Sequence, residues 1–437
     1  MKIGLEIHIY PRTESKLFCA CSADYVGKKG NENICEICTG QPGAKPLKLN
    51  QTVIEQAIEL SHFLHGTIVE KKQIKILRKH YFYPDLPNNF QRTTEPLIIQ
   101  GKFRGVNIRE IHAEEDAGDY DFEHGTVNFN RSGVPLLELV TEPELYSGPE
   151  TIEFLKEFKY LLDYLEFCRT GAEFKIDVNV SIGAERGEIK NLNSIHDIEI
   201  AIELEEQRQK MLMAQGKKIV RKTLHLDRKA RCLFESRDKE DTADYRHLPD
   251  PDIASFAIDS KMIEAIIQQA PIHPLNYRNQ LIQKGLAFST AQTICSKKNL
   301  VKSFSKISSR CDFLTAGLFF QKHVKHELEY RNISQSIEFL NEFLIEIIQK
   351  MKEKQIEEMQ AVEWLRNKLD GKTEMKISEN NLETAIKQIL EKNEQAVLDY
   401  RNGKQNSLNF LIGKIKQENK NQKVEIIQEI LLAKIKN

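Results

Sequence analysis

The sequence predicts an α+β protein with its strands in the amino-terminal part and helices in the carboxy-terminal part. Of the 437 residues, 16 of the 21 glycines and 11 of the 13 prolines precede residue 255. Turn formers at this density are typical of short strands joined by loops, and their scarcity is typical of helices. From about residue 261 onward, apolar residues recur almost throughout at helical spacing.

Two hydrophobic periods identify the elements of the first part. Residues 3–9 alternate between apolar and polar, which predicts a strand. Residues 126–129 and 175–182 have the same β-rich character. Apolar residues at helical spacing predict helices between these strands, at residues 52–64, 151–165 and 195–214.

The remainder reads as a succession of helices. The candidates are residues 333–351, 356–369, 381–390, 394–402, 406–417 and 423–435, and Gly371 stands where the second of them would stop. We therefore expect three domains, at residues 1–260, 261–370 and 371–437. The last domain has 12 Lys and Arg against 9 Asp and Glu, a surplus of three positive charges.

Composition narrows the class of protein. The net charge of −1 excludes a global basic field for nucleic acid, so a basic patch would have to be local. No uninterrupted apolar stretch approaches the roughly 20 residues that a membrane helix needs. Strand-like sequence begins within three residues of Met1, which predicts no secretory signal. We expect a cytoplasmic protein without membrane association, in which eight cysteines do not form a disulfide framework.

Four cysteines form two close pairs. Cys19 and Cys21 are followed, after thirteen residues, by Cys35 and Cys38. Two such pairs on facing turns can place four thiolates around one tetrahedral Zn²⁺. Four sulfur ligands leave no position for water, so we interpret the site as structural. The alternative is four buried or free thiols.

Four segments carry unusual polar density between apolar residues. They are Gly4–His8, His112–Gly118, Asn130–Glu138 and Asp177–Asn179 together with Glu188–Asn193. Carboxylates with a histidine and amide oxygens are ligands for a hard cation such as Mg²⁺, with phosphate completing the shell. Lys16, Arg131 and Lys190 could meet the phosphate charge. No Walker or Rossmann glycine motif occurs, and the alternative is a set of solvated strand faces.

Longer motifs resemble those of one family, the B subunits of tRNA-dependent amidotransferases (GatB), with their archaeal E-subunit relatives. The matching stretches are GLEIH (4–8), SKLFCAC (15–21), CEICTGQPGAKP (35–46), HYFYPDLP (80–87), HAEEDAG (112–118), NRSGVPLLELVTEPEL (130–145), DVNVS (177–181), EIKNLNS (188–194), DKEDTADYRHLPDPD (238–252) and AVLDYRNGKQNSLNFLIGKI (396–415). They span nearly the whole chain in family order.

The resemblance implies both a fold and a reaction. The fold would be a glutamine-synthetase-like cradle of antiparallel sheet, then a helical domain, then a small helical tail of YqeY type. The reaction would be ATP-dependent amidation of mischarged Glu-tRNA(Gln) or Asp-tRNA(Asn), a carbon–nitrogen ligation with glutamine as amido donor. ATP would phosphorylate the side-chain carboxylate, and ammonia would then displace phosphate.

The resemblance also implies partners and site residues. Ammonia would come from a glutaminase A subunit, alongside a small C subunit in a heterotrimer, because no glycine- and serine-rich amidase signature occurs here. The family's magnesium positions fall on Glu6, His8, Glu115 and Glu188, and Glu114, Asp177 and Asn130 are secondary candidates for substrate contact or support.

Some positions depart from the family pattern. A Glu pair that usually precedes the DVN motif is absent from residues 170–176, and His80 replaces an Asn. Two alternatives therefore stay open. One is a paralogue with the same carboxylate-activating chemistry on another acceptor. The other is a non-catalytic, zinc-stabilised tRNA-binding scaffold.

Overall fold

A computed structural model describes residues 1–69, 73–121, 123–169, 175–235, 246–372, 379–418 and 424–436. The chain divides into two compact units, one of Met1–Gln283 with Cys295–Val301 and the other of Lys284–Ile294 with Lys302–Asn437. The positions of the absent Glu pair and the first eight residues of the DKEDTADYRHLPDPD motif, 238–245, lie outside the described residues.

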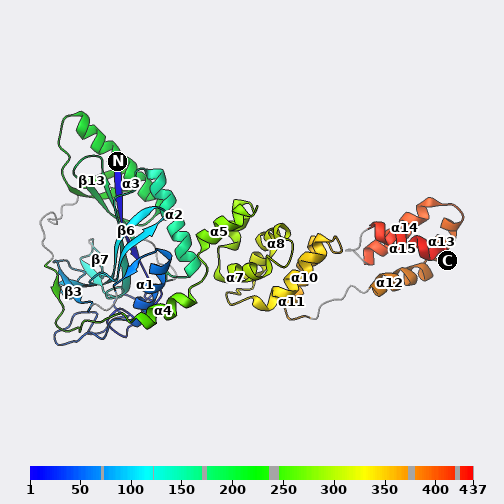
Figure 1. Cartoon of the computed structure of the whole chain (residues 1–437), viewed down its shortest axis with the longest axis horizontal. Coiled ribbons are helices and arrows are strands. Elements are labelled where there is room, and N and C mark those ends of the chain that lie inside the picture. The colour runs from blue at the N-terminus through cyan, green and yellow to red at the C-terminus, as the bar shows by residue number, and fades with distance from the viewer. Residues whose placement is uncertain are drawn as a thin grey trace. The chain divides into compact units, whose positions relative to one another are not determined.

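A large sheet dominates the first unit (Figure 1). Its path runs β13-β12-β11-β10-β1-β9-β6-β4-β3-β14, and β5 joins β2 to β6. The strands are β1 Lys2–Ile9, β2 Thr67–Ile68, β3 Ile76–His80, β4 Phe90–Thr94, β5 Ile98–Phe103, β6 Val106–Glu115, β9 Pro135–Thr141, β10 Lys175–Ser181, β11 Gly187–Leu192, β12 Lys222–Asp227, β13 Cys232–Glu235 and β14 Leu248–Pro249. A separate hairpin pairs β7 Asp119–Asp121 with β8 Thr126–Asn128.

The sheet is mostly antiparallel, as expected, but it contains one parallel pair and is therefore mixed. β11 and β12 pair parallel, whereas the other strand pairs of the large sheet are antiparallel in the described residues. The helix α3 (Ile195–Ala214) connects these two strands. A helical crossover returns the chain to the end where the first strand began, and the second strand therefore runs in the same direction.

Alternation along β1 determines which face of the sheet is buried. Ile3, Leu5, Ile7 and Ile9 are at most 1 % exposed. α3 packs on β10 and β11, and α2 (Gly148–Leu165) packs beside α3 (Figure 1). Ser147 and Ser194 cap these two helices by accepting hydrogen bonds from backbone N–H groups of the first turn. The apolar face of the sheet is thus covered by helices. The strand residues between these apolar ones point to the opposite face.

The remaining helices include counterparts of those predicted at 52–64 and 356–369, and the helices after residue 261 agree with the helical character predicted there. They are α1 Gln51–Phe63, α4 Ser260–Gln269, α5 Pro274–Gln283, α6 Phe288–Ile294, α7 Lys298–Ile307, α8 Phe313–Phe319, the π-helix η2 Phe320–Val324, α9 Lys325–Tyr330, the 3-10 turn η3 Glu338–Leu340, α10 Asn341–Lys352 and α11 Glu358–Leu369. The helix expected at 333–351 begins late. Asn332 adopts a left-handed φ of 52° that ends α9, and Ile337 is buried outside a helix.

The carboxy-terminal residues form four helices around a core of their own. These helices are α12 Glu379–Lys392, α13 Glu394–Arg401, α14 Gln405–Glu418 and α15 Val424–Lys436. Their buried residues form one hydrophobic cluster, made of Ile386, Ile389, Leu408, Leu411, Ile412, Ile415, Ile427, Leu431 and Ile435. A search of the described residues found no helix both long and apolar enough to cross a membrane.

Candidate functional site

The centre of the large sheet carries polar side chains on one face. β1 pairs with β9 so that His8 lies opposite Glu138, and with β10 so that Glu6 lies opposite Asp177. Directly opposed residues project from the same face, as do residues two apart along one strand. These four side chains therefore share the face that the helices α2 and α3 do not cover.

Glu6, His8 and Glu138 are close enough to share one ion. Each offers one ligand atom, and these atoms lie within 4.8 Å of one another. His8 Nε2 is 3.5 Å from Glu6 Oε1 and 3.6 Å from Glu138 Oε2, which is too long for good hydrogen bonds. This buried nitrogen has no hydrogen-bond partner in the part of the chain that the structure describes. A divalent cation between the three groups would complete the arrangement.

The charges of this group depend strongly on one another. Burial opposes the charged form of His8, but the carboxylates of Glu138 and Glu6 outweigh it and raise the pKa of His8 to about 10. Burial also opposes ionisation of Glu6, but His8, with Lys79 and Lys190, lowers the pKa of Glu6 to about 2. Without an ion, His8 therefore carries a proton between these carboxylates, and a divalent cation bound there would take the place of that proton.

Glu114 on β6 extends the same face. It is 4 % exposed, and Gln91 Nε2 donates to its Oε2 at 3.0 Å. Burial and the charge of Glu138 raise the pKa of Glu114. The charges of Glu114, Glu138 and Glu6 outweigh burial at Lys79 and raise the pKa of that ammonium. Lys79 is thus a cation held among three carboxylates.

Glu115 belongs to a different cluster. It follows Glu114 along β6, so its side chain points to the opposite face. Arg92 Nη1 lies 3.2 Å from Glu115 Oε2, and Arg92 Nε donates to Asp250 Oδ2 at 2.8 Å. Asp250 also accepts from Arg78 at 3.0 Å. Glu114 lies on the face of Glu6 and His8, and adjacent residues of a strand point to opposite faces. Glu115 therefore does not converge with Glu6 and His8 as expected.

Glu188 lies on the polar face but two strands from β1. It is opposite Asn179 on β10, and its carboxylate is 3.5 Å from Lys190 Nζ and 3.4 Å from Arg221 Nη2. Asn179 Oδ1 is buried without a hydrogen-bond partner among the described residues. The three-residue group around His8 does not include Glu188. The structure therefore places Glu188 beside basic side chains and an unsatisfied amide oxygen.

The three basic residues expected near phosphate lie in different places. Lys190 helps to lower the pKa of Glu6, and it opposes the burial and the Glu6 charge that raise the pKa of Asp177, so it faces the polar group. Arg131 Nε donates to the carbonyl of Ala117 at 3.0 Å and lies 3.3 Å from Asp116 Oδ2. Lys190 thus stays close to the centre of the face, and Arg131 is anchored to the loop that follows β6.

Lys16 is part of the cysteine cluster instead. It is 1 % exposed, and its Nζ lies 3.4 Å from Cys38 Sγ and 3.0 Å from the carbonyl of Asn33. A fully buried ammonium has no access to a phosphate on the polar face. We therefore assign Lys16 to the cysteines, where a positive charge compensates thiolate charge.

The four cysteines form the second group suited to an ion. The Sγ atoms of Cys19, Cys21, Cys35 and Cys38 lie within 4.8 Å of one another, and those of Cys35 and Cys38 are 3.9 Å apart. Around a tetrahedral Zn²⁺ with bonds of about 2.3 Å, sulfur atoms lie roughly 3.8 Å apart. The cluster therefore has the composition and the spacing that a tetrahedral metal needs.

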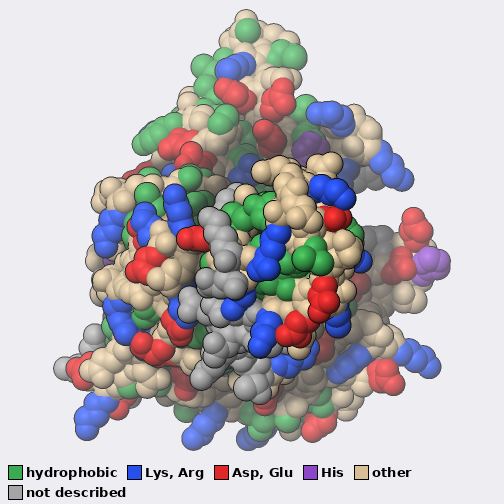
Figure 2. Space-filling view, turned by 90° about the vertical axis from the view of Figure 1, so that its right-hand side faces the viewer, with side chains coloured by type: hydrophobic (Ala, Val, Ile, Leu, Met, Phe, Trp, Pro, Cys, Tyr) green, Lys and Arg blue, Asp and Glu red, His purple; other side chains and the backbone are tan. Residues whose placement is uncertain are grey.

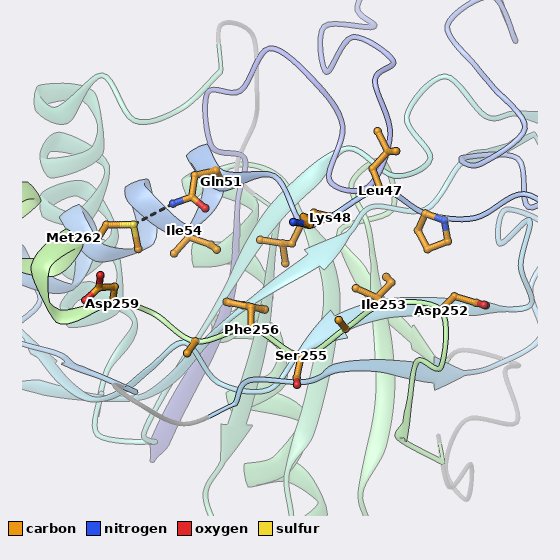
Figure 3. Close-up of a pocket in the computed structure, with 14 residues that line it drawn as sticks. Leu47, Lys48, Gln51, Ile54, Asp252, Ile253, Ser255, Phe256, Asp259 and Met262 are labelled. Atoms are coloured by element: carbon orange, nitrogen blue, oxygen red, sulfur yellow. Dashed lines mark hydrogen bonds between the residues drawn. The ribbon is translucent and has the colours of Figure 1, made fainter.

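A pocket of about 540 Å³ lies outside the polar face. Its lining comes from residues 46–54 and 252–262, and Figure 3 shows Leu47, Ile54, Ile253 and Phe256 around it. The lining contains neither a glutamate nor a histidine. Its charged lining residues, Lys48, Asp252 and Asp259, do not include any member of the group formed by Glu6, His8 and Glu138, so we place the candidate site on the polar face and not in this pocket.

Two important residues escaped prediction. Glu138 closes the polar segment Asn130–Glu138 but is not among the predicted ligands, because β9 has no alternating pattern and only the register with β1 brings Glu138 to His8. Arg92 carries no motif signal of its own. Its partners Glu115 and Asp250 are far from it in the sequence and meet it only through the pairing of β4, β6 and β14 with their neighbours.

Comparisons with known proteins identify the family of this chain. Residues 1–264 match the model described as the GatB/GatE catalytic domain, and residues 302–435 match the model described as the GatB domain. The B subunit of an aspartyl/glutamyl-tRNA(Asn/Gln) amidotransferase from Methanobrevibacter smithii is 36 % identical over 429 residues, covering 95 % of each chain. The protein of the same name from Methanopyrus kandleri is 34 % identical over 440 residues, covering 97 % of this chain and 95 % of its own.

A third relative covers almost the entire length of both proteins. The corresponding B subunit from Methanococcus aeolicus is 33 % identical over 465 residues, covering 99 % of this chain and 98 % of its own. The resemblance seen in the motifs is thereby confirmed. On the extent of these matches, this chain belongs to the GatB/GatE family.

Proposed function

We propose that this chain is the amidating subunit of a glutamine-dependent aminoacyl-tRNA amidotransferase, a carbon–nitrogen ligase that amidates mischarged Asp-tRNA(Asn), Glu-tRNA(Gln) or both. Relatedness to subunits of that name over nearly the full chain supports the substrate class. The observation that carries the chemistry is the unpartnered His8 Nε2 between Glu6 and Glu138 on the polar sheet face, within the part of the chain that the structure describes.

The side-chain carboxylate of the substrate is a poor acyl donor until a phosphoryl group makes one oxygen a leaving group. Such a transfer from ATP depends on positioning and charge neutralisation. A divalent cation supplies that neutralisation when bound. Glu6, His8 and Glu138 would hold it, with Mg²⁺ favoured by the two carboxylates and Mn²⁺ accommodated by the imidazole. Lys190 would meet the phosphate charge, whereas Arg131 would hold the loop that follows β6.

The other expected ligands take different roles in this proposal. Glu188 is suited to a second cation on the same face, because the buried Oδ1 of Asn179 lies on the opposing strand without a partner among the described residues. Glu115 is a positioning residue, since its contacts with Arg92 support the end of β6 next to Glu114. Lys79, among Glu114, Glu138 and Glu6, fixes the charge of the polar face.

The cysteine cluster holds one structural Zn²⁺ in this proposal. We expect about one equivalent of zinc in protein purified without chelator, since four thiolates leave no vacant position. Elemental analysis of the purified chain tests this. Absence of zinc after expression in zinc-supplied medium contradicts the assignment, because apo cysteines would then be the native state.

Partners follow from the same chemistry. Ammonia must reach the activated carboxylate from a glutaminase, so we expect a complex with an A subunit and a small C subunit. The relatives are named as B subunits, which supports an assembly of several chains. We also expect the carboxy-terminal helices to contact tRNA away from the chemistry.

The decisive experiment replaces Glu138 and supplies ammonia directly. In the reconstituted complex with mischarged tRNA, ATP and ammonium chloride, Glu138→Gln should reduce amidation about 10²–10³-fold, because a charge at the reacting centre is lost. Supplying ammonia bypasses the glutaminase. The matched control is Glu142→Gln, the same change at an exposed residue paired with Arg109, which should retain full activity.

Two results overturn the proposal. One is wild-type rates for Glu138→Gln, which would remove the polar group from the mechanism. The other is a wild-type complex that amidates no mischarged tRNA yet activates a different carboxylate with ATP, which would make the chain a paralogue with another acceptor.

A further inference from the structure

We propose that Asn130 and Ser132 are positioning residues through which the metal-loaded cysteine loop, residues 15–41, controls the conformation of the polar face. The proposal rests on the function proposed above. It also goes beyond that function, since it gives the cysteine loop a role in the reaction. The connection runs through the loop segment, residues 129–134, that lies between β8 and β9.

The side chain of Asn130 is occupied entirely by the cysteine loop. It is 1 % exposed, its Oδ1 accepts from the N–H of Asn33 at 2.8 Å, and its Nδ2 donates to the carbonyl of Lys29 at 2.8 Å. Both ends of the amide are thus used, and no end is left for substrate. Asn130, which the family resemblance places near the substrate, therefore acts between two loops.

A second link reaches a metal ligand directly. Ser132 Oγ donates to the carbonyl of Cys38 at 2.9 Å in a buried site. Gly133 follows with a φ of 79°, and a Cβ there would lie 3.5 Å from the Cβ of Cys38. Lys16 completes the connection, because its Nζ contacts Cys38 Sγ at 3.4 Å and the carbonyl of Phe129 at 3.5 Å.

The loop segment is also hydrogen-bonded to the residue that follows β6. Gly133 donates to the carbonyl of Asp116 at 2.9 Å, and Asp116 donates to the carbonyl of Val134 at 2.8 Å. Arg131 lies 3.3 Å from Asp116 Oδ2. This segment leads into β9, which carries Glu138, and the end of β6 carries Glu114. Loss of the metal would free the cysteine loop, and with it the segment that aligns Arg131 and these two glutamates.

The test combines Asn130→Ala with removal of zinc from the full complex. In wild type, a chelator should raise hydrogen exchange at the N–H groups of Asp116 and Gly133 at least tenfold and raise the KM for ATP more than it lowers kcat. Asn130→Ala should produce the same two changes with zinc still bound. Chelation of Asn130→Ala should add little, because the connection is already cut.

Controls separate this coupling from general destabilisation. Asn341→Ala removes a buried asparagine that accepts from Ser303 in the other compact unit, and it should leave both readouts unchanged. Ser132→Ala, a smaller change, covers the case in which Asn130→Ala fails to fold, and it should show the same pattern. Additive effects of mutation and chelation, or unchanged exchange after zinc loss, overturn the proposal. Hydrogen exchange measures the coupling between the two loops even if the complex shows no amidation. A failure of the proposed function can therefore be distinguished from a failure of this inference.

Discussion

Glu205 is completely buried on α3, and its carboxylate is fixed by two neighbours on the same helix. Arg208 donates to both carboxylate oxygens at 2.7 Å, and Gln209 donates to Oε1 at 2.6 Å. Gly187, at the start of β11, lies directly against this carboxylate, so that a Cβ added there would be 2.0 Å from Glu205 Oε1. A glycine is required at this position by packing, not by its backbone angles.

Gly187→Ala should therefore destabilise the chain by about 1–3 kcal/mol, the usual cost of overpacking a site that cannot relax. The midpoint of urea unfolding measures the change. The matched control is Gly148→Ala at the start of α2, where an added Cβ meets only Ile202 Cγ2 at 3.7 Å. The control should be neutral or slightly stabilising. Equal midpoints for the two variants would show that Glu205 can move.

At the same scale, the sequence predicts neighbours along one strand better than neighbours across strands. Because side chains along a strand alternate between its two faces, the sequence alone predicts that Glu6 and His8 share a face. The same alternation places Glu115 on the face opposite to Glu114, which the family motif does not reveal. Glu138 is 130 residues away from His8 and reaches it only through the register of β1 and β9. Lys16 looked like a phosphate ligand because charged residues are usually exposed, and only packing reveals its burial against Cys38.

At the scale of the element, Asp312 shows how one carboxylate holds a helix. Its Oδ1 accepts from the backbone N–H of Thr315 at 2.9 Å and from the Thr315 hydroxyl at 2.7 Å, which caps α8. Lys352 lies 3.1 Å from its Oδ2. Hydrogen bonds from the Thr315 side chain and backbone, with a smaller contribution from Lys352, lower the pKa of Asp312 from 3.8 to about 2.

Asp312→Ala should cost about 1 kcal/mol of stability near neutral pH, the typical value of an N-cap. Because the folded pKa lies below the unfolded one, the stabilisation is present above pH 3.8 and disappears as the pH falls towards about 2. Urea unfolding of both proteins between pH 2 and 7 checks this. Asp312→Asn keeps a capping oxygen and should recover most of the loss at pH 7, whereas an equal loss for both variants would contradict the capping role.

Helices and strands with a clear period were predicted well, and connections were not. The prediction of 195–214 matches α3, Ile195–Ala214, and the prediction of 175–182 lies within one residue of β10. The helix predicted from residue 333 fails over its first turns, because Ile337 is buried without being helical. Apolar spacing reports burial, and it cannot distinguish a buried turn from a helix.

At the scale of the whole molecule, the carboxy-terminal helices possess what independent folding requires. α12 to α15 contribute every member of their hydrophobic cluster, and Leu411, Ile415, Ile427 and Leu431 in it are fully buried. Basic and acidic side chains are interspersed with hydrophobic ones on the face that Figure 2 shows. Phe410 is 48 % exposed, and the Nζ of Lys414 lies 5.9 Å from its ring centroid.

Deletion of residues 371–437 should weaken tRNA binding and leave the sheet-containing unit folded. The deleted segment has three surplus positive charges, and basic side chains that neutralise phosphates make affinity depend on salt. The slope of log affinity against log salt should become shallower by nearly one, about 0.9 on duplex regions, for each phosphate that the deleted segment neutralises. Filter binding of tRNA between about 50 and 200 mM salt, a range in which such charges change affinity strongly, measures both effects.

Leu411→Asp provides the matched point variant, because it places a charge in the core of the tail and keeps the length of the chain. It should reproduce the loss of tRNA affinity and the shallower salt dependence of binding. Zinc content and the amidation rate at saturating concentrations of mischarged tRNA should stay at wild-type levels. If both variants bind tRNA with unchanged affinity and slope, the tail only packs against the protein, and recognition has to come from the sheet unit. If amidation at saturating tRNA is also lost, the tail acts on the chemistry and not on binding alone.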